Sequence, residues 1–214
     1  MIARTEKNLK ETQALIERGG GKAEFLIADL SKIDSLNQLI SQVKNKIKRI
    51  EMLVNVAGIW HGKDEVFAGK DFTSFSQEII LETYSVGIIT PTLLAHAFAP
   101  LMPRGGKILN ISGTFENGAK GWLPYYVSKR AIEDLTIGLA EELKEKGIQV
   151  NAISPSDTAT DAYKKYFPQY VSEAIEPEEI AKEAVFLCSG EANGITGKVF
   201  VMKKGKSPFE GYHS

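Results

Sequence analysis

Several features that are common in proteins are scarce in this 214-residue sequence, and each absence excludes a class of function. A single cysteine, Cys188, excludes an internal disulfide and agrees with a reducing compartment. The histidines, His61, His96 and His213, are too scattered to form a metal site with that cysteine. We therefore expect neither a disulfide framework nor a bound metal.

The sequence also lacks an excess of charge and a long apolar run. Its formal net charge is −1 and its pI is about 6.3, so no basic surface points to nucleic acid. No stretch approaches the length of a membrane span, and the charged N-terminus has no apolar signal region. We expect a cytoplasmic protein that binds neither nucleic acid nor membrane.

What is present is the composition of one α/β domain. Hydrophobic residues make up 43% of the chain, which is enough to bury a substantial core, and nothing calls for a second domain. Helices are expected over residues 6–18, 31–48, 76–102 with a bend at Pro91, 125–147, and from residue 176 onward. Strands are expected over residues 23–30, 50–58, 107–113, 148–155 and 198–202.

The helix expected over residues 125–147 begins with a phenol and an ammonium group on one face. Tyr125 and Lys129 are one helical turn apart, so their side chains lie side by side. A cation near a phenol oxygen favours the phenolate, which lets a tyrosine exchange a proton near neutral pH. Tyr126 and Arg130 share the same spacing, and most such pairs are surface pairs. The pair alone therefore leaves a surface role open.

The strands on either side of this helix carry further motifs. The motifs are Asn110-Ile111-Ser112, Tyr125-Tyr126-Val127-Ser128-Lys129, and Asn151-Ala152-Ile153-Ser154-Pro155 with Thr160-Asp161. In order and spacing they resemble the short-chain dehydrogenase/reductase family of NAD(P)-dependent oxidoreductases, over nearly the whole chain. The resemblance implies a Rossmann-like, doubly wound parallel sheet in three layers.

The resemblance also implies a reaction, in which a carbonyl is reduced to an alcohol, or the reverse, by hydride transfer. Tyr125 would donate the proton, Ser112 would hold the carbonyl oxygen, and Lys129 would lower the pKa of the phenol and bind the cofactor ribose. Counting back from Tyr125 selects Ser112, whereas matching the strand residues selects Gly113, and Thr114 is a further candidate. The substrate would be a small-molecule carbonyl or alcohol.

The cofactor contacts follow from the same resemblance. The expected set is Arg4, Asp29, Leu30, Asn55, Ala57, Gly58, Tyr125, Lys129, Pro155, Thr158 and Thr160. Asn55 would contact the cofactor or tie adjacent strand ends together, and plain turn chemistry explains Thr158 and Thr160 equally well. Arg4 would suit a 2′-phosphate, which gives a weak preference for NADP over NAD.

Two departures from the family pattern bear on function. The first strand and Gly-rich turn that hold the pyrophosphate have no counterpart, since Gly19-Gly20-Gly21 follows a helix and precedes a strand. We expect an N-terminally truncated domain, with that unit encoded upstream of Met1, and weak cofactor binding by this chain. Tyr84 occupies a position that often carries an active-site asparagine, which puts that water-linked proton route in doubt.

Two further expectations concern partners. The helices over residues 76–102 and 125–147 correspond to the pair through which family members associate, which implies a homo-oligomer, either a dimer or a tetramer. The aromatic segment 163–170 predicts a lid over the substrate. A non-catalytic binding or interaction protein on a degenerate dehydrogenase fold is the alternative. The missing Gly-rich unit supports that alternative, and the retained Tyr125 and Lys129 argue against it.

Overall fold

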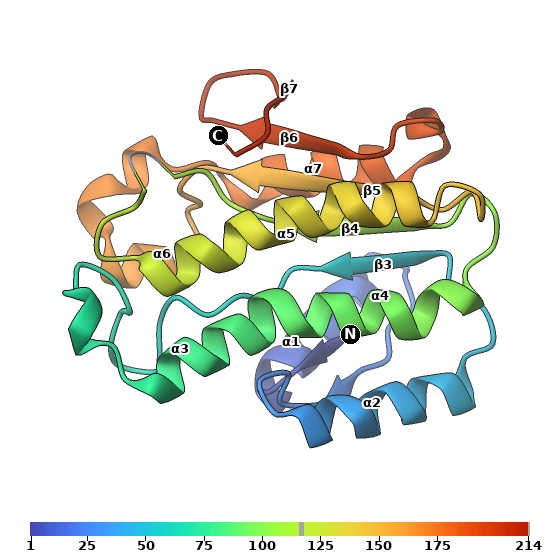
Figure 1. Cartoon of the computed structure of the whole chain (residues 1–214), viewed down its shortest axis with the longest axis horizontal. Coiled ribbons are helices and arrows are strands. Elements are labelled where there is room, and N and C mark those ends of the chain that lie inside the picture. The colour runs from blue at the N-terminus through green and yellow to red at the C-terminus, as the bar shows by residue number, and fades with distance from the viewer. Residues whose placement is uncertain (116–117, 214) are drawn as a thin grey trace. The chain divides into compact units, whose positions relative to one another are not determined.

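The computed structural model describes residues 1–115 and 118–213, and the chain divides into two compact units (Figure 1). The first unit is Met1–Lys48 and the second is Arg49–Ser214. Both units contain parallel strand pairs. The expectation of a single domain over residues 1–214 stays a prediction.

The first unit is a small βαβα segment. It contains β1 (Ile2–Ala3), α1 (Glu6–Arg18), β2 (Leu26–Ile27) and α2 (Ile33–Lys46), with β1 and β2 paired in parallel. The helix that the sequence predicted from residue 31 begins later, because Lys32 holds the N-cap position of α2. The Ser31 hydroxyl and N–H instead donate to the Asp29 carboxylate at 2.8 and 3.0 Å. Aspartate commonly captures donors two residues ahead, in a local turn.

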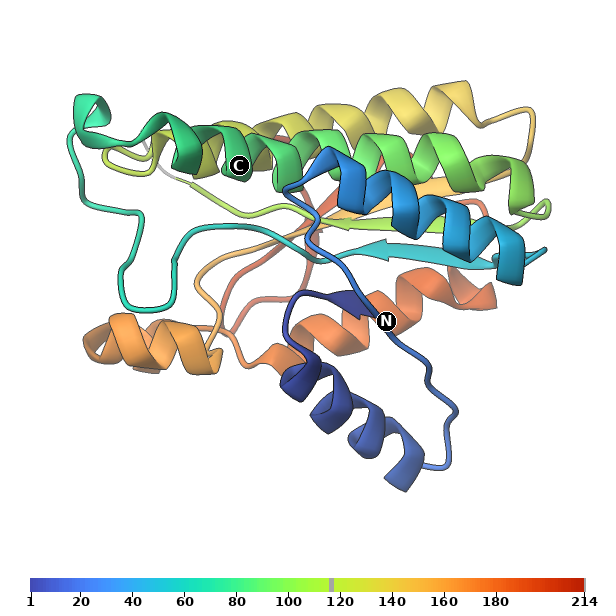
Figure 2. The same ribbon diagram turned by 90° about the horizontal axis from the view of Figure 1, so that it is seen from below.

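The second unit is a five-stranded sheet with helices on both faces. Its strands are β3 (Met52–Asn55), β4 (Lys107–Ile111), β5 (Gln149–Pro155), β6 (Lys198–Met202) and β7 (Phe209–Glu210), in that spatial order. Only β7 is antiparallel to its neighbour. Figures 1 and 2 show α4 (Thr90–Phe98) and α5 (Leu123–Glu142) on one face and α7 (Pro177–Cys188) on the other. The predicted α/β fold with a parallel sheet is confirmed.

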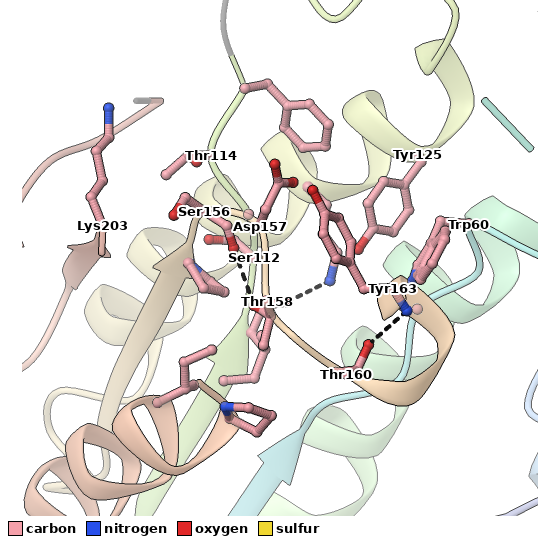
Figure 3. Close-up of a pocket in the computed structure, with 18 of the residues that line it drawn as sticks. Trp60, Ser112, Thr114, Tyr125, Ser156, Asp157, Thr158, Thr160, Tyr163 and Lys203 are labelled. Carbon is pink, nitrogen blue, oxygen red and sulfur yellow. Dashed lines mark hydrogen bonds between the residues drawn. The ribbon is translucent and has the colours of Figure 1, made fainter. Parts of the chain in front are cut away.

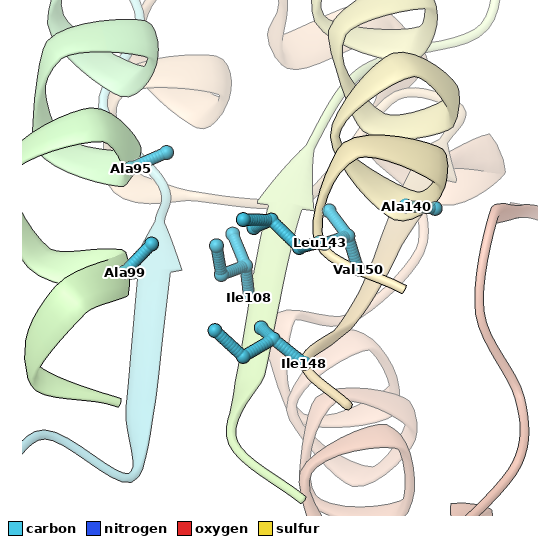
Figure 4. Close-up of a cluster of buried hydrophobic side chains, with 7 residues drawn as sticks. All are labelled: Ala95, Ala99, Ile108, Ala140, Leu143, Ile148 and Val150. Atoms are coloured by element: carbon cyan, nitrogen blue, oxygen red, sulfur yellow. The ribbon is translucent and has the colours of Figure 1, made fainter. Parts of the chain in front are cut away.

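The core of this unit lies on both faces of the sheet. On one face, alanines of α4 and α5 meet branched side chains of the strands (Figure 4); the cluster is Ala95, Ala99, Ile108, Ala140, Leu143, Ile148 and Val150. On the other face, Leu109 and Ile153 pack against Leu187 of α7. Successive strand residues point to opposite faces, so Ile108 and Leu109 are both buried. This is why β4 is an apolar run without alternation.

The long helix expected over residues 76–102 is interrupted. It divides into α3 (Gln77–Tyr84), a π-helical turn (Ser85–Ile89), α4, and a short 3-10 turn (Ala99–Leu101). Pro91 lies in the first turn of α4, where its missing N–H is tolerated. The helix is therefore interrupted at the π turn and not, as expected, bent at Pro91. A Cβ on Gly87 would lie 2.6 Å from the Cβ of Ser128, so only glycine lets this turn approach α5.

One sequence expectation about membranes needs correction. By length and composition alone, the helical segment Gln77–Leu101 could cross a membrane, although the sequence indicated no such stretch. The core helix of a soluble protein passes the same test. Val86, Leu94 and Phe98 of this segment are buried within the second unit, which accounts for its apolar character.

Short helices and turns complete the second unit. They are α6 (Asp161–Tyr166) and four 3-10 segments, Phe72–Ser74, Ala99–Leu101, Pro168–Glu173 and Gly190–Ala192. The Thr160 hydroxyl caps α6 by accepting the Tyr163 N–H at 3.2 Å. The expected lid segment, residues 163–170, therefore consists of α6 and the turn that follows it.

Candidate active site

A cavity of about 1060 Å³ opens where the strands β3, β4 and β5 end (Figure 3). Ser112, Gly113 and Pro155 line it from the strand ends, and Tyr125 and Lys129 line it from α5. Ligands of open parallel α/β sheets bind in the crevice at the carboxyl ends of the strands. The cavity is therefore the candidate active site of the second unit.

Tyr125 and Lys129 meet in this cavity, as their spacing predicted. The Lys129 side chain is only 4% exposed, and its Nζ lies 5.3 Å from the centroid of the Tyr125 ring. The same Nζ donates to the backbone carbonyl of Ile111 at 2.8 Å. The ammonium group is thus fixed between the end of β4 and the phenol ring.

Burial changes the acidity of both groups. It raises the pKa of the Tyr125 phenol well above its ordinary value, and it lowers the pKa of Lys129 to about 8. The sequence led us to expect Lys129 to lower the pKa of the phenol. Desolvation outweighs that attraction here. The phenol therefore keeps its proton at neutral pH.

Two of the predicted cofactor residues, Gly58 and Asn55, have structural roles beside the site. A Cβ on Gly58 would lie 3.3 Å from the Lys129 Nζ and 3.4 Å from a ring carbon of Tyr125, so a side chain there would crowd the pair. The Asn55 side-chain amide donates to the Asn110 side-chain oxygen at 2.8 Å, between residues paired across β3 and β4. Asn55 thus ties adjacent strand ends together, which is one of the two roles its position suggested.

The two candidate hydroxyls differ in their surroundings. Ser112 is 2% exposed, and its hydroxyl donates to the carboxylate of Glu133 at 3.0 Å. Thr114 is half-buried and lines the cavity, and its backbone N–H donates to the Pro155 carbonyl at 3.0 Å. Gly113 has no hydroxyl to offer. Both residues line the cavity, but the Ser112 hydroxyl is already engaged by a buried acceptor.

Sequence reasoning missed Glu133. Its carboxylate is fully buried one helical turn after Lys129, and it accepts hydrogen bonds from Ser112 and Ser154, both at 3.0 Å. The backbone N–H of His213 donates to its other oxygen at 2.7 Å. The sequence signal that could have identified Glu133 is an acidic residue four positions after Lys129, on the same buried face of the helix.

Three predicted cofactor residues line the cavity at the end of β5 and in the loop after it. Pro155 ends the strand, and Thr158 and Thr160 lie in the loop. The Thr158 hydroxyl donates to the Ser156 carbonyl at 3.1 Å, and the Thr160 hydroxyl caps α6. Turn chemistry therefore accounts for both hydroxyls. Ala57 is exposed directly after the exposed Val56, which also lines the cavity.

The remaining predicted cofactor residues belong to the first unit. Arg4 is exposed, and Leu30 and Asp29 are half-buried at the end of the β2 segment. Partial burial opposes ionisation of Asp29, but hydrogen bonds from Ser31 and the charges of Arg4 and Lys32 together lower its pKa. Asp29 is therefore an ionised acceptor at neutral pH, already engaged by Ser31.

Comparison with known proteins places this arrangement in a family. A family model described as enoyl-(acyl carrier protein) reductase matches residues 1–207. The 3-oxoacyl-(acyl-carrier-protein) reductase FabG of Aquifex aeolicus (strain VF5) is 27% identical over 205 residues, which cover 90% of this chain and 80% of the relative. The 7alpha-hydroxysteroid dehydrogenase of Escherichia coli (strain K12) is 28% identical over 203 residues, covering 89% and 76%.

Solved structures agree with this placement. The reductase LugOII, described as promiscuous and as catalysing keto-reduction at C1 during lugdunomycin biosynthesis, has a TM-score of 0.81 and 27% identity, covering 93% of this chain and 83% of its own. A blue fluorescent protein from a metagenomic library, in complex with NADPH, has a TM-score of 0.80 and 25% identity, covering 94% and 82%. With the family model matching nearly every residue, the chain belongs to the short-chain dehydrogenase/reductase family of NAD(P)-dependent oxidoreductases.

Proposed function

We propose that the protein reduces a ketone or aldehyde to an alcohol, or catalyses the reverse, with Tyr125 as the proton donor. The observation that carries this proposal is the contact of buried Lys129 with half-buried Tyr125 at the strand ends, with Nζ 5.3 Å from the ring centroid. A buried lysine without a purpose is costly, since desolvation penalises its charge. A surface or purely structural role would not need both groups inside a cavity.

The cofactor, when bound, supplies a hydride to the carbonyl carbon. Tyr125 gives its phenolic proton to the carbonyl oxygen as negative charge develops there, so one C–H and one O–H bond form. The raised pKa of the phenol keeps that proton in place until the oxygen becomes a stronger base. Lys129 provides a positive charge beside the ring, which stabilises the phenolate that remains.

The residues that surround the cavity of the second unit are compatible with a bound nicotinamide cofactor. A Cβ at Gly58 would crowd Tyr125 and Lys129, so glycine keeps the space above the pair open. Pro155, Thr158 and Thr160 line the same cavity and offer the carboxamide contacts implied by the family. Arg4 supports a weak preference for NADP, and a solved relative is named as an NADPH complex. We place the protein in the cytoplasm as a homo-oligomer.

An assay of turnover tests the proposed function. Purified protein is mixed with NADPH or NADH and a panel of ketones and aldehydes, and loss of the reduced cofactor's absorbance is followed. We expect consumption that depends on both the carbonyl and the enzyme. Calorimetry on the same sample measures cofactor binding. Cofactor binding without turnover of any carbonyl would favour the alternative of a non-catalytic binding protein.

The hydroxyls of Ser112 and Thr114 give a second test of the proposed function. Although the sequence selected Ser112, the geometry favours Thr114 as the donor to the carbonyl oxygen, because the Ser112 hydroxyl is held by Glu133. We expect Thr114→Val to lower kcat by about 10²-fold, the size of one lost oxyanion donor. Ser112→Ala is expected to change kcat less and to lower the free energy of unfolding by about 1 kcal/mol. Steady-state kinetics and denaturant unfolding measure both effects, and the opposite pattern would restore Ser112 to the role.

A further inference from the structure

We propose that the site takes a ketone carried on a fused apolar ring system, which lies against a wall formed by Trp60, Trp122 and Phe167. The inference rests on the proposed function, because it names the substrate class of the same cavity. All three residues line the cavity and are half-buried, so each ring keeps part of its surface open to it. We call these three residues the aromatic wall.

The rings of the aromatic wall form a closed triangle of contacts. Their centroids are 6.3 Å apart for Trp60 and Trp122, 6.1 Å for Trp60 and Phe167, and 5.9 Å for Trp122 and Phe167. The corresponding ring planes are inclined to one another by only 39°, 31° and 33°. Three rings with similar orientation present one broad apolar surface, which matches a flat or fused ring better than a single flexible chain.

The chain holds this wall in place from three separate segments. Trp60 follows β3, Trp122 precedes α5, and Phe167 follows α6. The Lys165 ammonium and the Tyr166 hydroxyl donate to the Lys63 carbonyl at 3.0 and 3.1 Å, which joins the Trp60 loop to α6. A wall fixed before the ligand arrives costs less ordering entropy on binding than one that has to form around it.

The aromatic wall starts beside the proposed proton donor. The centroid of Trp122 is 6.1 Å from that of Tyr125. A carbonyl that accepts the Tyr125 proton therefore has its attached carbon skeleton against Trp122 and the rest of the wall. Figure 3 shows Trp60 on the Tyr125 side of the cavity, with Lys203 on the far side.

The charges that line the cavity also favour a neutral substrate at the wall. Asp157 and Glu173 line the cavity with Tyr163, whose ring lies 5.3 Å from that of Phe167. Burial, together with a hydrogen bond to Asp157 and the charge of Glu173, raises the pKa of the Tyr163 phenol. Carboxylates beside the wall repel an anionic group there. Among the described residues that line the cavity, the cations are Lys129, Lys203 and Lys204. Lys203 and Lys204 would suit the alternative class of substrate, an anionic acyl thioester.

Kinetics with matched substrates test the wall. Decalone, a fused-ring ketone, is compared with a straight-chain ketone that has the same number of carbon atoms and with acetoacetyl-coenzyme A. We expect the unmodified protein to give the highest kcat/KM with decalone. Trp122→Ala should lower kcat/KM for decalone by about 10-fold, the size of one lost aromatic contact plus apolar area, and lower it less for the straight chain. The control Phe72→Ala removes an exposed ring outside the cavity. It should leave unchanged the ratio of kcat/KM for decalone to kcat/KM for the straight-chain ketone.

Binding can be measured without turnover, because Trp60 and Trp122 are the two tryptophans of the chain. Decalone lacks the aromatic absorption of tryptophan, so its binding should shift the intrinsic emission without interference. Trp60→Phe and Trp122→Phe keep a ring at each position and should each retain part of that shift. A saturable shift without turnover would support the ring site and count against the proposed reduction. Turnover of acetoacetyl-coenzyme A or the straight chain in preference to decalone, with no loss in Trp122→Ala, would support the reduction and overturn the ring site.

Discussion

Replacing Tyr125 by phenylalanine is expected to lower kcat for ketone reduction by about 10²- to 10⁴-fold, the usual contribution of a positioned proton donor. The phenol oxygen supplies the proton for the forming alkoxide, and among the described residues Tyr125 is the one whose ring contacts the Lys129 ammonium group. The phenylalanine ring fills the same volume beside Phe115 and Trp122, so folding should be nearly unaffected. Cofactor affinity should also stay close to that of the unmodified protein. Steady-state kinetics and calorimetry on the purified variant measure these effects.

Tyr126→Phe is the matched control for this experiment. Tyr126 repeats the pattern one residue later, with the Arg130 guanidinium 5.3 Å from its ring centroid and the Phe115 ring 5.4 Å away. It is absent from the described lining of the cavity, so losing its hydroxyl should change kcat little. A silent Tyr125→Phe together with an inactive Tyr126→Phe would show that the motif is one residue out of register, and the role of Lys129 would fall with it.

Local patterns predicted most of the second unit. Burial on both faces of a parallel sheet makes apolar runs such as β4, and the spacing of apolar residues in α5 locates the helix that carries Tyr125. The π turn at Ser85–Ile89 could not be predicted in this way. In this turn Gly87 closely approaches Ser128 of α5, and the two residues are far apart in sequence.

The site was predictable only where its parts share one helix. Tyr125 and Lys129 are related by helical geometry, so their contact followed from spacing. The direction of the Ser112 hydroxyl depends instead on Glu133, which approaches from another element. The aromatic wall is assembled from three loops, and no periodicity in the sequence relates Trp60 to Phe167. Tertiary packing, rather than local pattern, decides such contacts.

Replacing Lys129 by methionine should abolish most of the activity. It should also remove a buried group whose titration makes the unmodified protein more stable as the pH rises. The pKa of Lys129 falls from 10.5 in its ordinary state to about 8 in the folded protein, because burial penalises the ammonium. Between these two values the unfolded chain binds the proton and the folded chain does not. Raising the pH through this window therefore stabilises the unmodified protein, whereas the burial cost is fully present below pH 8.

The free energy of unfolding of the unmodified protein, minus that of Lys129→Met, should rise between pH 8 and 10.5, with a slope of order 1 kcal/mol per pH unit. Taking the difference cancels the other titrating groups, and denaturant unfolding at several pH values measures it. Over the same range kcat of the unmodified protein should fall, because the ammonium that stabilises the phenolate is lost. A protein that gains stability while it loses activity identifies Lys129 as a buried charge kept for chemistry. A flat stability difference would mean that Lys129 is solvated, and the activation of Tyr125 would then need another source.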